Sequence, residues 1–116
     1  MADSCLFCRI VAGEIPATVV HETERTLAFR DVGARAPVRV LVIPKEHHET
    51  VAALVSADPA LTAEVVEAAA AVAEAEGVTK SGYRLLFNTG PDSGQQVFHV
   101  HAHVIGGRPL GALVGD

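Results

Sequence analysis

The sequence predicts an α+β fold: an antiparallel sheet of about five strands with one long helix packed on a face. Three observations support this prediction. Short segments rich in β-branched residues recur along the chain. Two of them, residues 18–22 and 26–31, are separated by only three residues, which predicts a hairpin. One long segment, residues 58–76, has the apolar spacing of a helix.

The first half of the chain begins with a short predicted helix over residues 4–12, which Ser4 caps and Gly13 ends. The hairpin follows. Residues 38–43 are an almost unbroken β-branched run with Arg39 inside it. Such a run predicts a central strand, and the proline that follows closes it.

The second half begins with a short amphipathic segment over residues 50–55. Asp58-Pro59 then marks the start of the long helix, because a carboxylate caps the free amides and proline suits the first helical position. Gly77 ends this helix. A strand over 82–87 and a loop over 88–96 complete the chain up to the last strand.

The apolar arc of the 58–76 helix is wider than one sheet requires. It spans roughly 220°, whereas covering a sheet needs about 100°. The surplus is mostly alanine, which would let a second helix approach closely. The alternative is that alanine simply favours helix on an exposed surface. We expect a twofold contact between two copies here, with Ala69 and Ala73 in it.

Length and composition limit the classes of protein. The 116 residues suit one domain over residues 1–116, and 49% are apolar, as in a folded chain. The apolar runs are far shorter than the roughly 20 residues of a membrane span. The first residues lack the features of a signal peptide, so a cytoplasmic location is expected. A formal charge of −5 without Lys/Arg runs argues against polymeric nucleic acid as a partner.

Three histidines alternate near the C-terminus, in the segment His99-Val100-His101-Ala102-His103-Val104-Ile105. In a strand over these residues the three imidazoles share one face, and the residues between them point into a core. The simplest interpretation is a half-buried strand whose wet face happens to carry histidine. Half of the chain's six histidines lie here, however, and neutral imidazole is a nucleophile, proton carrier and metal ligand. We therefore expect a functional site.

Cys5 and Cys8 form a Cys-x-x-Cys pair, which in a reducing compartment indicates metal or redox chemistry. A metal site needs further ligands, and the candidates are His47, His48 and His99. Two thiolates with two imidazoles would form a closed tetrahedral zinc site, which is structural. The alternative is a pair of reduced cysteines without metal.

The histidine segment resembles the signature of the histidine triad (HIT) superfamily, His-φ-His-φ-His-φ-φ with φ apolar. Other landmarks of the family follow in family order, and Gly106-Gly107-Arg108 resembles its Hint branch, the purine nucleoside phosphoramidases. The shared segments are Cys5–Ile10, Gly13–Pro16, Leu27–Asp31, Val42–Lys45 and Gly94–Val97.

The resemblance implies a HIT-like fold and a homodimer in which one sheet continues across both subunits. It implies that His101 attacks the α-phosphorus of AMP joined to an amine or lysine and carries the nucleotidyl group until water removes it. His103 would hold phosphate oxygens or the leaving group. It also implies one structural zinc ion per chain and no organic cofactor. Its ligands would be Cys5, Cys8, His47 and His99.

The nucleotide-binding residues are implied by the same resemblance. Asp31 would accept hydrogen bonds from the ribose hydroxyls, although a strand-terminal aspartate is usually a turn starter. The loop before the histidines would hold the α-phosphate through Asn88, Gly94, Gln96 and the backbone of Val97. The purine would lie between apolar side chains that could equally be plain core. These are Ile15, Phe29 and Val32.

Two other functions compete with a phosphoramidase. A dinucleoside polyphosphate hydrolase of the Fhit kind would use the same nucleophile, but Gly106-Gly107-Arg108 and the short tail argue against it. A nucleotide-binding regulatory protein with incidental turnover is the third interpretation. In Hint proteins the C-terminus can reach the partner subunit's site and affect substrate choice. The tail over residues 109–116 has no aromatic residue, which argues against the same role here.

Overall fold

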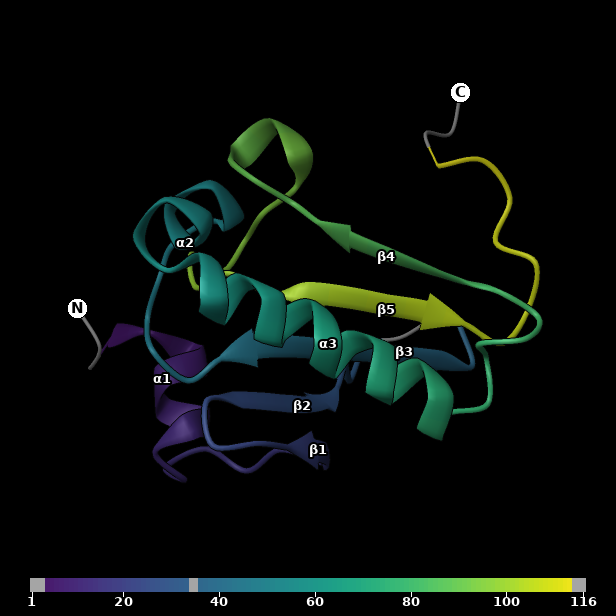
Figure 1. Ribbon diagram of the computed structural model, residues 1–116, viewed down its shortest axis with the longest axis horizontal. Coiled ribbons are helices and arrows are strands. Elements are labelled where there is room, and N and C mark those ends of the chain that lie inside the picture. The colour runs from purple at the N-terminus through teal and green to yellow at the C-terminus, as the bar shows by residue number, and fades with distance from the viewer. Residues whose placement is uncertain (1–3, 34–35, 114–116) are drawn as a thin grey trace.

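The computed structural model describes residues 4–33 and 36–113, so both ends of the predicted domain, residues 1 and 116, lie outside it. The described residues form one five-stranded antiparallel sheet in the order β1-β2-β3-β5-β4 (Figure 1). This confirms the predicted α+β class. The elements are α1 (Leu6–Val11), β1 (Val19–Glu22), β2 (Thr26–Arg30), β3 (Val38–Pro44), α2 (Val51–Ala57), α3 (Pro59–Ala75), β4 (Tyr83–Phe87), the 3-10 helix η2 (Pro91–Ser93) and β5 (Ala102–Gly106).

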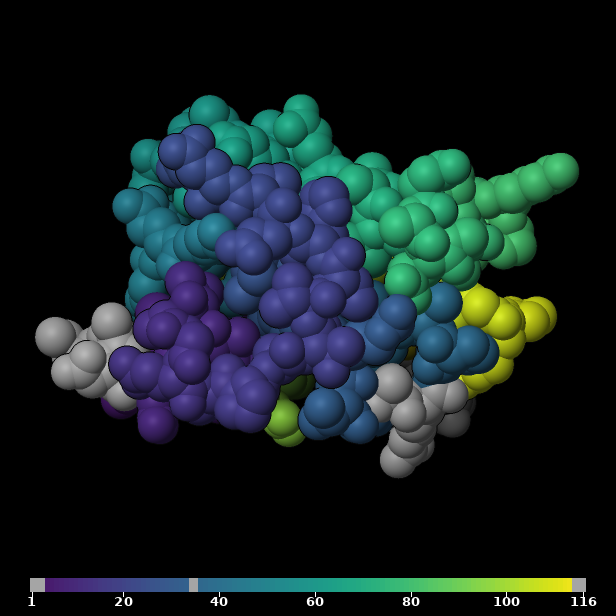
Figure 2. Space-filling model, turned by 90° about the horizontal axis from the view of Figure 1, so that it is seen from below, coloured from purple at the N-terminus to yellow at the C-terminus, as the bar shows by residue number. Residues whose placement is uncertain are grey.

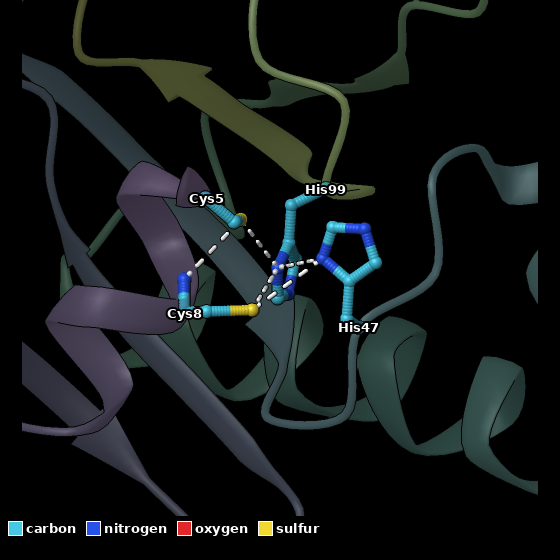
Figure 3. A group of neighbouring side chains, drawn as sticks. All are labelled: Cys5, Cys8, His47 and His99. Carbon is cyan, nitrogen blue, oxygen red and sulfur yellow. Dashed lines mark hydrogen bonds between the residues drawn. The ribbon is translucent and has the colours of Figure 1, made fainter. Parts of the chain in front are cut away.

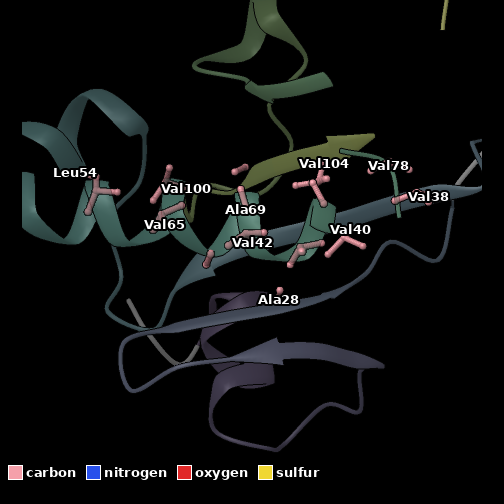
Figure 4. Packing of buried hydrophobic residues seen from close by; sticks show 14 of the residues in the cluster. Ala28, Val38, Val40, Val42, Leu54, Val65, Ala69, Val78, Val100 and Val104 are labelled. Carbon is pink, nitrogen blue, oxygen red and sulfur yellow. The ribbon is translucent and has the colours of Figure 1, made fainter. Parts of the chain in front are cut away.

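The central strand β3 has two buried faces, as its apolar run predicts. Val38, Val40 and Val42 pack beneath α3 in the main core (Figure 4). The alternate residues Leu41 and Ile43 point to the opposite face, where they form a smaller core with Phe7 of α1. Both faces of the sheet are therefore covered, one by α3 and the other by the N-terminal segment.

The long helix α3 starts as predicted. The Asp58 carboxylate accepts a hydrogen bond of 3.0 Å from the Leu61 amide, and Pro59 is the first helical residue. The predicted position of Ala69 and Ala73 is wrong: both are fully buried against the sheet of their own subunit. The apolar residues left exposed on α3 include Val66 and Ala70.

The last strand is shorter than predicted, because β5 begins only at Ala102. Its register with β3 pairs Val42 with Ala102, which would place Pro44 opposite Val100. Proline has no amide hydrogen to donate, so the ladder stops there. The amide of Val100 instead donates to the carbonyl of His48 at 2.7 Å. Val100, Ala102 and Val104 still point into the main core, as predicted.

The N-terminal segment lies against the strands at one side of the molecule, where Figure 2 shows it in purple beside the blue-violet hairpin of β1 and β2. Helix α1 is shorter than predicted, and Cys5 occupies the cap position predicted for Ser4: its sulfur accepts a hydrogen bond from the Cys8 amide. Within the described residues no helix is long and apolar enough to cross a membrane.

Candidate active site and metal centre

The hydrogen bonds of His101 fix which ring nitrogen is free. Nδ1 lies 2.8 Å from the backbone carbonyl of His99. A carbonyl oxygen can only accept, so Nδ1 carries the hydrogen and donates it. Nε2 therefore keeps its lone pair. This is the tautomer that a nucleophilic histidine requires, and the sequence predicted such an acceptor for its second nitrogen.

The three histidines share one face as predicted, but this face is buried, and not wet as the simplest interpretation of the strand had it. His99, His101 and His103 are 0%, 8% and 7% exposed. Helix α1 covers two of them, because its Phe7 ring stands edge-on to the rings of His99 and His101, with centroids 5.9 and 5.1 Å away. The rings of His101 and His103 are themselves 4.9 Å apart. Helix α1 thus turns an open face into a covered site.

Burial keeps these imidazoles neutral. It lowers the pKa of His101, although the His99 carbonyl and the charge of Asp31 act in the opposite direction. Burial also lowers the pKa of His103 to about 4, and the neighbouring His101 and Arg39 add to this effect. Near pH 7 both rings are therefore unprotonated at one nitrogen, the state in which an imidazole can act as a nucleophile.

A hollow of about 510 Å³ opens beside His101 and His103, a volume typical of a small-molecule site. Every residue predicted to bind the nucleotide lines it. Helix α1 and the segment after it form one wall, β2 and β3 a second, and the loop before β5 a third. The predicted lining residues are Ile15, Phe29, Asp31, Val32, Asn88, Gly94, Gln96 and Val97.

Asp31 serves the turn that follows β2 as well as this hollow. Its carboxylate accepts a hydrogen bond of 3.1 Å from the Gly33 amide, the local role that its strand-terminal position suggested. Its second oxygen lies 3.0 Å from Nε of Arg39 on β3. The Asp31 side chain is therefore oriented from two directions at the edge of the hollow.

The loop between β4 and β5 is shaped by Gln95, a residue that sequence reasoning missed. Gln95 is 6% exposed, and its side chain accepts from the Gly90 amide at 2.8 Å while donating to the carbonyls of Glu49 and Val97. Gly94 has a φ of 95°, which favours glycine. This loop is therefore an organised wall of the hollow.

A second cluster lies at His99, where Cys5, Cys8, His47 and His99 converge (Figure 3). Their ligand atoms all lie within 4.8 Å of one another. These residues can coordinate a metal ion. His48, the other candidate, is excluded by its orientation, because its Nε2 lies 2.9 Å from the Glu46 carboxylate.

The cluster has the dimensions of a tetrahedral site. Bonds of about 2.3 Å to sulfur and 2.05 Å to nitrogen place the ligand atoms about 3.6 Å apart for an N–S pair and about 3.3 Å apart for an N–N pair. Nδ1 of His99 lies 3.4 and 3.5 Å from the sulfurs of Cys5 and Cys8, and 3.3 Å from Nδ1 of His47. The donor set fits zinc or a similar ion with no open position.

A backbone group also orients His99 toward this cluster. Its Nε2 donates to the carbonyl of Pro44 at 2.8 Å, which leaves Nδ1 free to bind the ion. Burial lowers the pKa of His99 to about 4, so the ring is neutral, as a ligand must be. The three histidines therefore face two different places: His99 faces the cysteines, and His101 and His103 face the hollow.

Two further residues of the site were not predicted. The sequence does not single out Phe7, yet this residue contacts the rings of both His99 and His101. Arg39 lines the hollow beside His103. A signal for Arg39 was available, since a charge within an apolar central strand needs a partner or a site.

Fold and site together define a hollow of small-molecule size beside a buried, neutral histidine, next to a cluster of four residues that can hold a metal ion. The model of the HIT domain family matches residues 12–110, and the chain belongs to this family. It is 38% identical to the purine nucleoside phosphoramidase of Escherichia coli K12 over 114 residues, covering 98% of this chain and 96% of the relative.

Solved structures agree with this assignment. A HIT family hydrolase from Clostridium thermocellum superposes with a TM-score of 0.91 at 40% identity, covering 97% of each chain. One from Legionella pneumophila superposes with a TM-score of 0.87 at 47% identity, covering 91% of this chain and 95% of the other. The chain is therefore a hydrolase with the HIT fold.

Proposed function

We propose that this protein hydrolyses the P–N bond of purine nucleoside 5′-phosphoramidates, such as AMP joined to an amine. The observation that carries the proposal is the tautomer of His101, whose Nδ1 donates to the His99 carbonyl and whose Nε2 is free beside the hollow. The similarity to a phosphoramidase, 38% over nearly the full chain, supports the same bond as the target.

The reaction has two steps. The lone pair of His101 Nε2 attacks the α-phosphorus, the P–N bond breaks, and the departing amine takes a proton from solvent. Water then attacks the phosphorus, the Nε2–P bond breaks, and the mononucleotide leaves as a proton returns to solvent. Dividing the displacement in this way lowers each barrier. His103 and the amides near Gly94 and Val97 would stabilise the charge on the phosphate oxygens.

The rest of the hollow would hold the nucleoside. Asp31 offers acceptor oxygens to the ribose hydroxyls, and Asn88 and Gln96 offer polar groups near the phosphate. Ile15, Phe29 and Val32 would flank the purine. Phe29 is only 4% exposed and also belongs to the small core, so it would contribute one edge of its ring, whereas Val32 is fully exposed and could move onto the base.

The metal that we propose for the Cys5, Cys8, His47 and His99 cluster is zinc. Zinc is the ion that two thiolates and two imidazoles bind in a closed tetrahedron. Because all four positions are occupied by protein, the ion would stabilise the fold around His99 and would not contact the substrate. The chemistry would then rest on His101 and the groups that hold the phosphate, and not on the metal.

The test of the proposed function is a comparison of three ligands. We expect steady-state turnover of adenosine 5′-phosphoramidate to exceed that of a diadenosine polyphosphate at least about a hundredfold in kcat/KM, because only the first has a P–N bond. AMP should bind as a competitive product. Faster cleavage of the diadenosine compound would indicate a dinucleoside polyphosphate hydrolase, and AMP binding without turnover of either would indicate a regulatory protein.

We also propose a homodimer. Its interface would consist of the β4 edge and one flank of α3 from each of the two subunits. Strand β4 is a terminal strand of the described sheet. On α3, Glu64 pairs with Arg25 of the β1–β2 turn, so this flank faces β1. At 100° per residue, Val66 and Ala70 lie on the other flank, toward β4, and both are exposed.

The dimer predicts a difference between two neighbouring alanines. Ala70→Glu should place a charge in the contact and weaken association at least about tenfold, whereas Ala71→Glu, an exposed position on the flank toward β1, should not. Sedimentation of both variants beside the unmutated chain measures this. A monomeric unmutated chain at micromolar concentration, or equal dissociation of the two variants, would contradict the proposed interface.

A further inference from the structure

A second hollow of about 360 Å³ borders the first one past His103. The two share three residues, namely Arg39, Asn88 and His103. A ligand whose phosphate lies at His101 in the first hollow can therefore extend past His103 into the second without leaving the protein surface. The nucleoside occupies the first hollow in the proposed function, so the group beyond the phosphate is the one that would enter the second.

The strongest indication that a ligand binds at this boundary comes from His103. The residue is 7% exposed, and neither of its ring nitrogens has a hydrogen-bond partner among the described residues. Leaving a buried polar group unpaired is costly, so such a group in a native site is typically completed by a ligand or water. His99 and His101, in contrast, each have a ring nitrogen that is hydrogen-bonded to a backbone carbonyl. The two unpaired ring nitrogens of His103 thus lie where the two hollows meet.

The second hollow has an apolar floor. Leu86 of β4 lies directly beside His103 in the register of β5, and Ile105 follows two residues later on the same face. Leu113 of the C-terminal segment borders the same hollow and is 69% exposed. Arg84, the β4 partner of Ile105, donates to the carbonyl of Gly111 at 2.8 Å, which holds that segment near the floor.

The charges around this hollow disfavour a cationic guest. Among the described residues that line it there is no aspartate or glutamate, and the fixed charge among them is the guanidinium of Arg39. Asp31 lies 3.0 Å from that guanidinium and belongs to the first hollow. The far end of a lysine, with its ammonium and carboxylate, would lose its hydration here without gaining a counter-charge for the ammonium.

We propose that this second hollow is the amine chamber of the enzyme, and that it selects phosphoramidates whose amine carries an uncharged apolar group. The inference rests on the proposed phosphoramidase function and specifies its substrate class. Apolar groups gain from leaving water, and each buried methylene is worth up to about fourfold in kcat/KM. The amine chamber would thus contribute to selectivity through Leu86, Ile105 and Leu113, while bond cleavage stays with His101.

The test uses four AMP phosphoramidates, those of methylamine, butylamine, hexylamine and the lysine side chain. For the unmutated chain we expect kcat/KM to rise about tenfold or more from methyl to hexyl, with the lysine compound no better than the methyl one. Leu113→Glu should reduce the hexyl-to-methyl ratio at least about threefold, and Leu86→Ala should reduce it likewise. Val55→Glu, an exposed apolar residue of α2 outside the chamber, is the matched control and should leave the ratio unchanged.

The outcomes separate the two proposals. Turnover of all four compounds at similar kcat/KM would keep the phosphoramidase and overturn the amine chamber. A rising series whose slope is the same in Leu113→Glu, Leu86→Ala and Val55→Glu would also overturn it, since the selectivity would then arise elsewhere. No turnover of any phosphoramidate would overturn the proposed function itself.

Discussion

Replacing His101 with alanine is expected to lower kcat for adenosine 5′-phosphoramidate by more than a hundredfold, while AMP affinity changes by less than about threefold. The reason is that Nε2 of His101 is the bond-forming atom in the proposed reaction, whereas AMP would still be held by the loop before β5, by His103 and by Asp31. The loss should therefore fall on kcat and not on ground-state binding.

The variant needs a control for packing, because the ring of His101 is 8% exposed and lies between Phe7 and His103. Alanine would leave a small void and a loss of stability that has nothing to do with chemistry. His101→Asn fills part of the space and keeps an amide donor for the His99 carbonyl. It should therefore be as inactive as His101→Ala yet more stable in thermal unfolding.

Direct evidence would come from the intermediate. With rapid acid quench, mass spectrometry should find a nucleotidyl group on the peptide that carries residues 99–103 of the unmutated protein, and none in either His101 variant. His103→Ala should be intermediate in rate, since it removes charge stabilisation but not the attacking atom. A His101 variant that keeps more than about a hundredth of kcat would mean that water attacks directly, and the covalent mechanism would fail.

The sequence predicted the fold correctly wherever an element depends on residues that are close together in the chain. The Asp58-Pro59 start, the β-branched run of β3 and the hairpin all depend on neighbours in the chain, and all three elements lie within a residue or two of their predicted bounds. The late start of the histidine strand depends instead on Pro44, which lies opposite Val100 only after the sheet has formed.

The same limit explains the errors at the site. The sequence predicted that the three histidines lie together, because alternation puts them on one face of the strand. Their burial was not, because Phe7 reaches them from a helix more than 90 residues away in sequence. Ala69 and Ala73 were misplaced for a related reason: helical periodicity gives the width of an apolar arc but not which part of it faces the sheet.

Removal of the metal is expected to have the largest effect on stability. Protein purified without added metal should contain about one equivalent of zinc per chain, and Cys5→Ser with Cys8→Ser should contain less than about a tenth. An ion that binds only the folded chain at about a thousandfold above its Kd stabilises it by about 4 kcal/mol. For a domain of this size that corresponds to a fall in Tm of about 10 °C or more.

Two adjacent histidines provide the matched comparison. Nδ1 of His47 points into the cluster, 3.4 Å from the Cys8 sulfur, whereas the His48 ring is turned to Glu46. His47→Ala should therefore lose the metal and the stability that accompanies it, and His48→Ala should keep both. Elemental analysis and thermal unfolding, with and without a chelator, measure the two effects separately. Full zinc content in the double cysteine variant, or equal metal loss from both histidine variants, would show that the ion binds elsewhere.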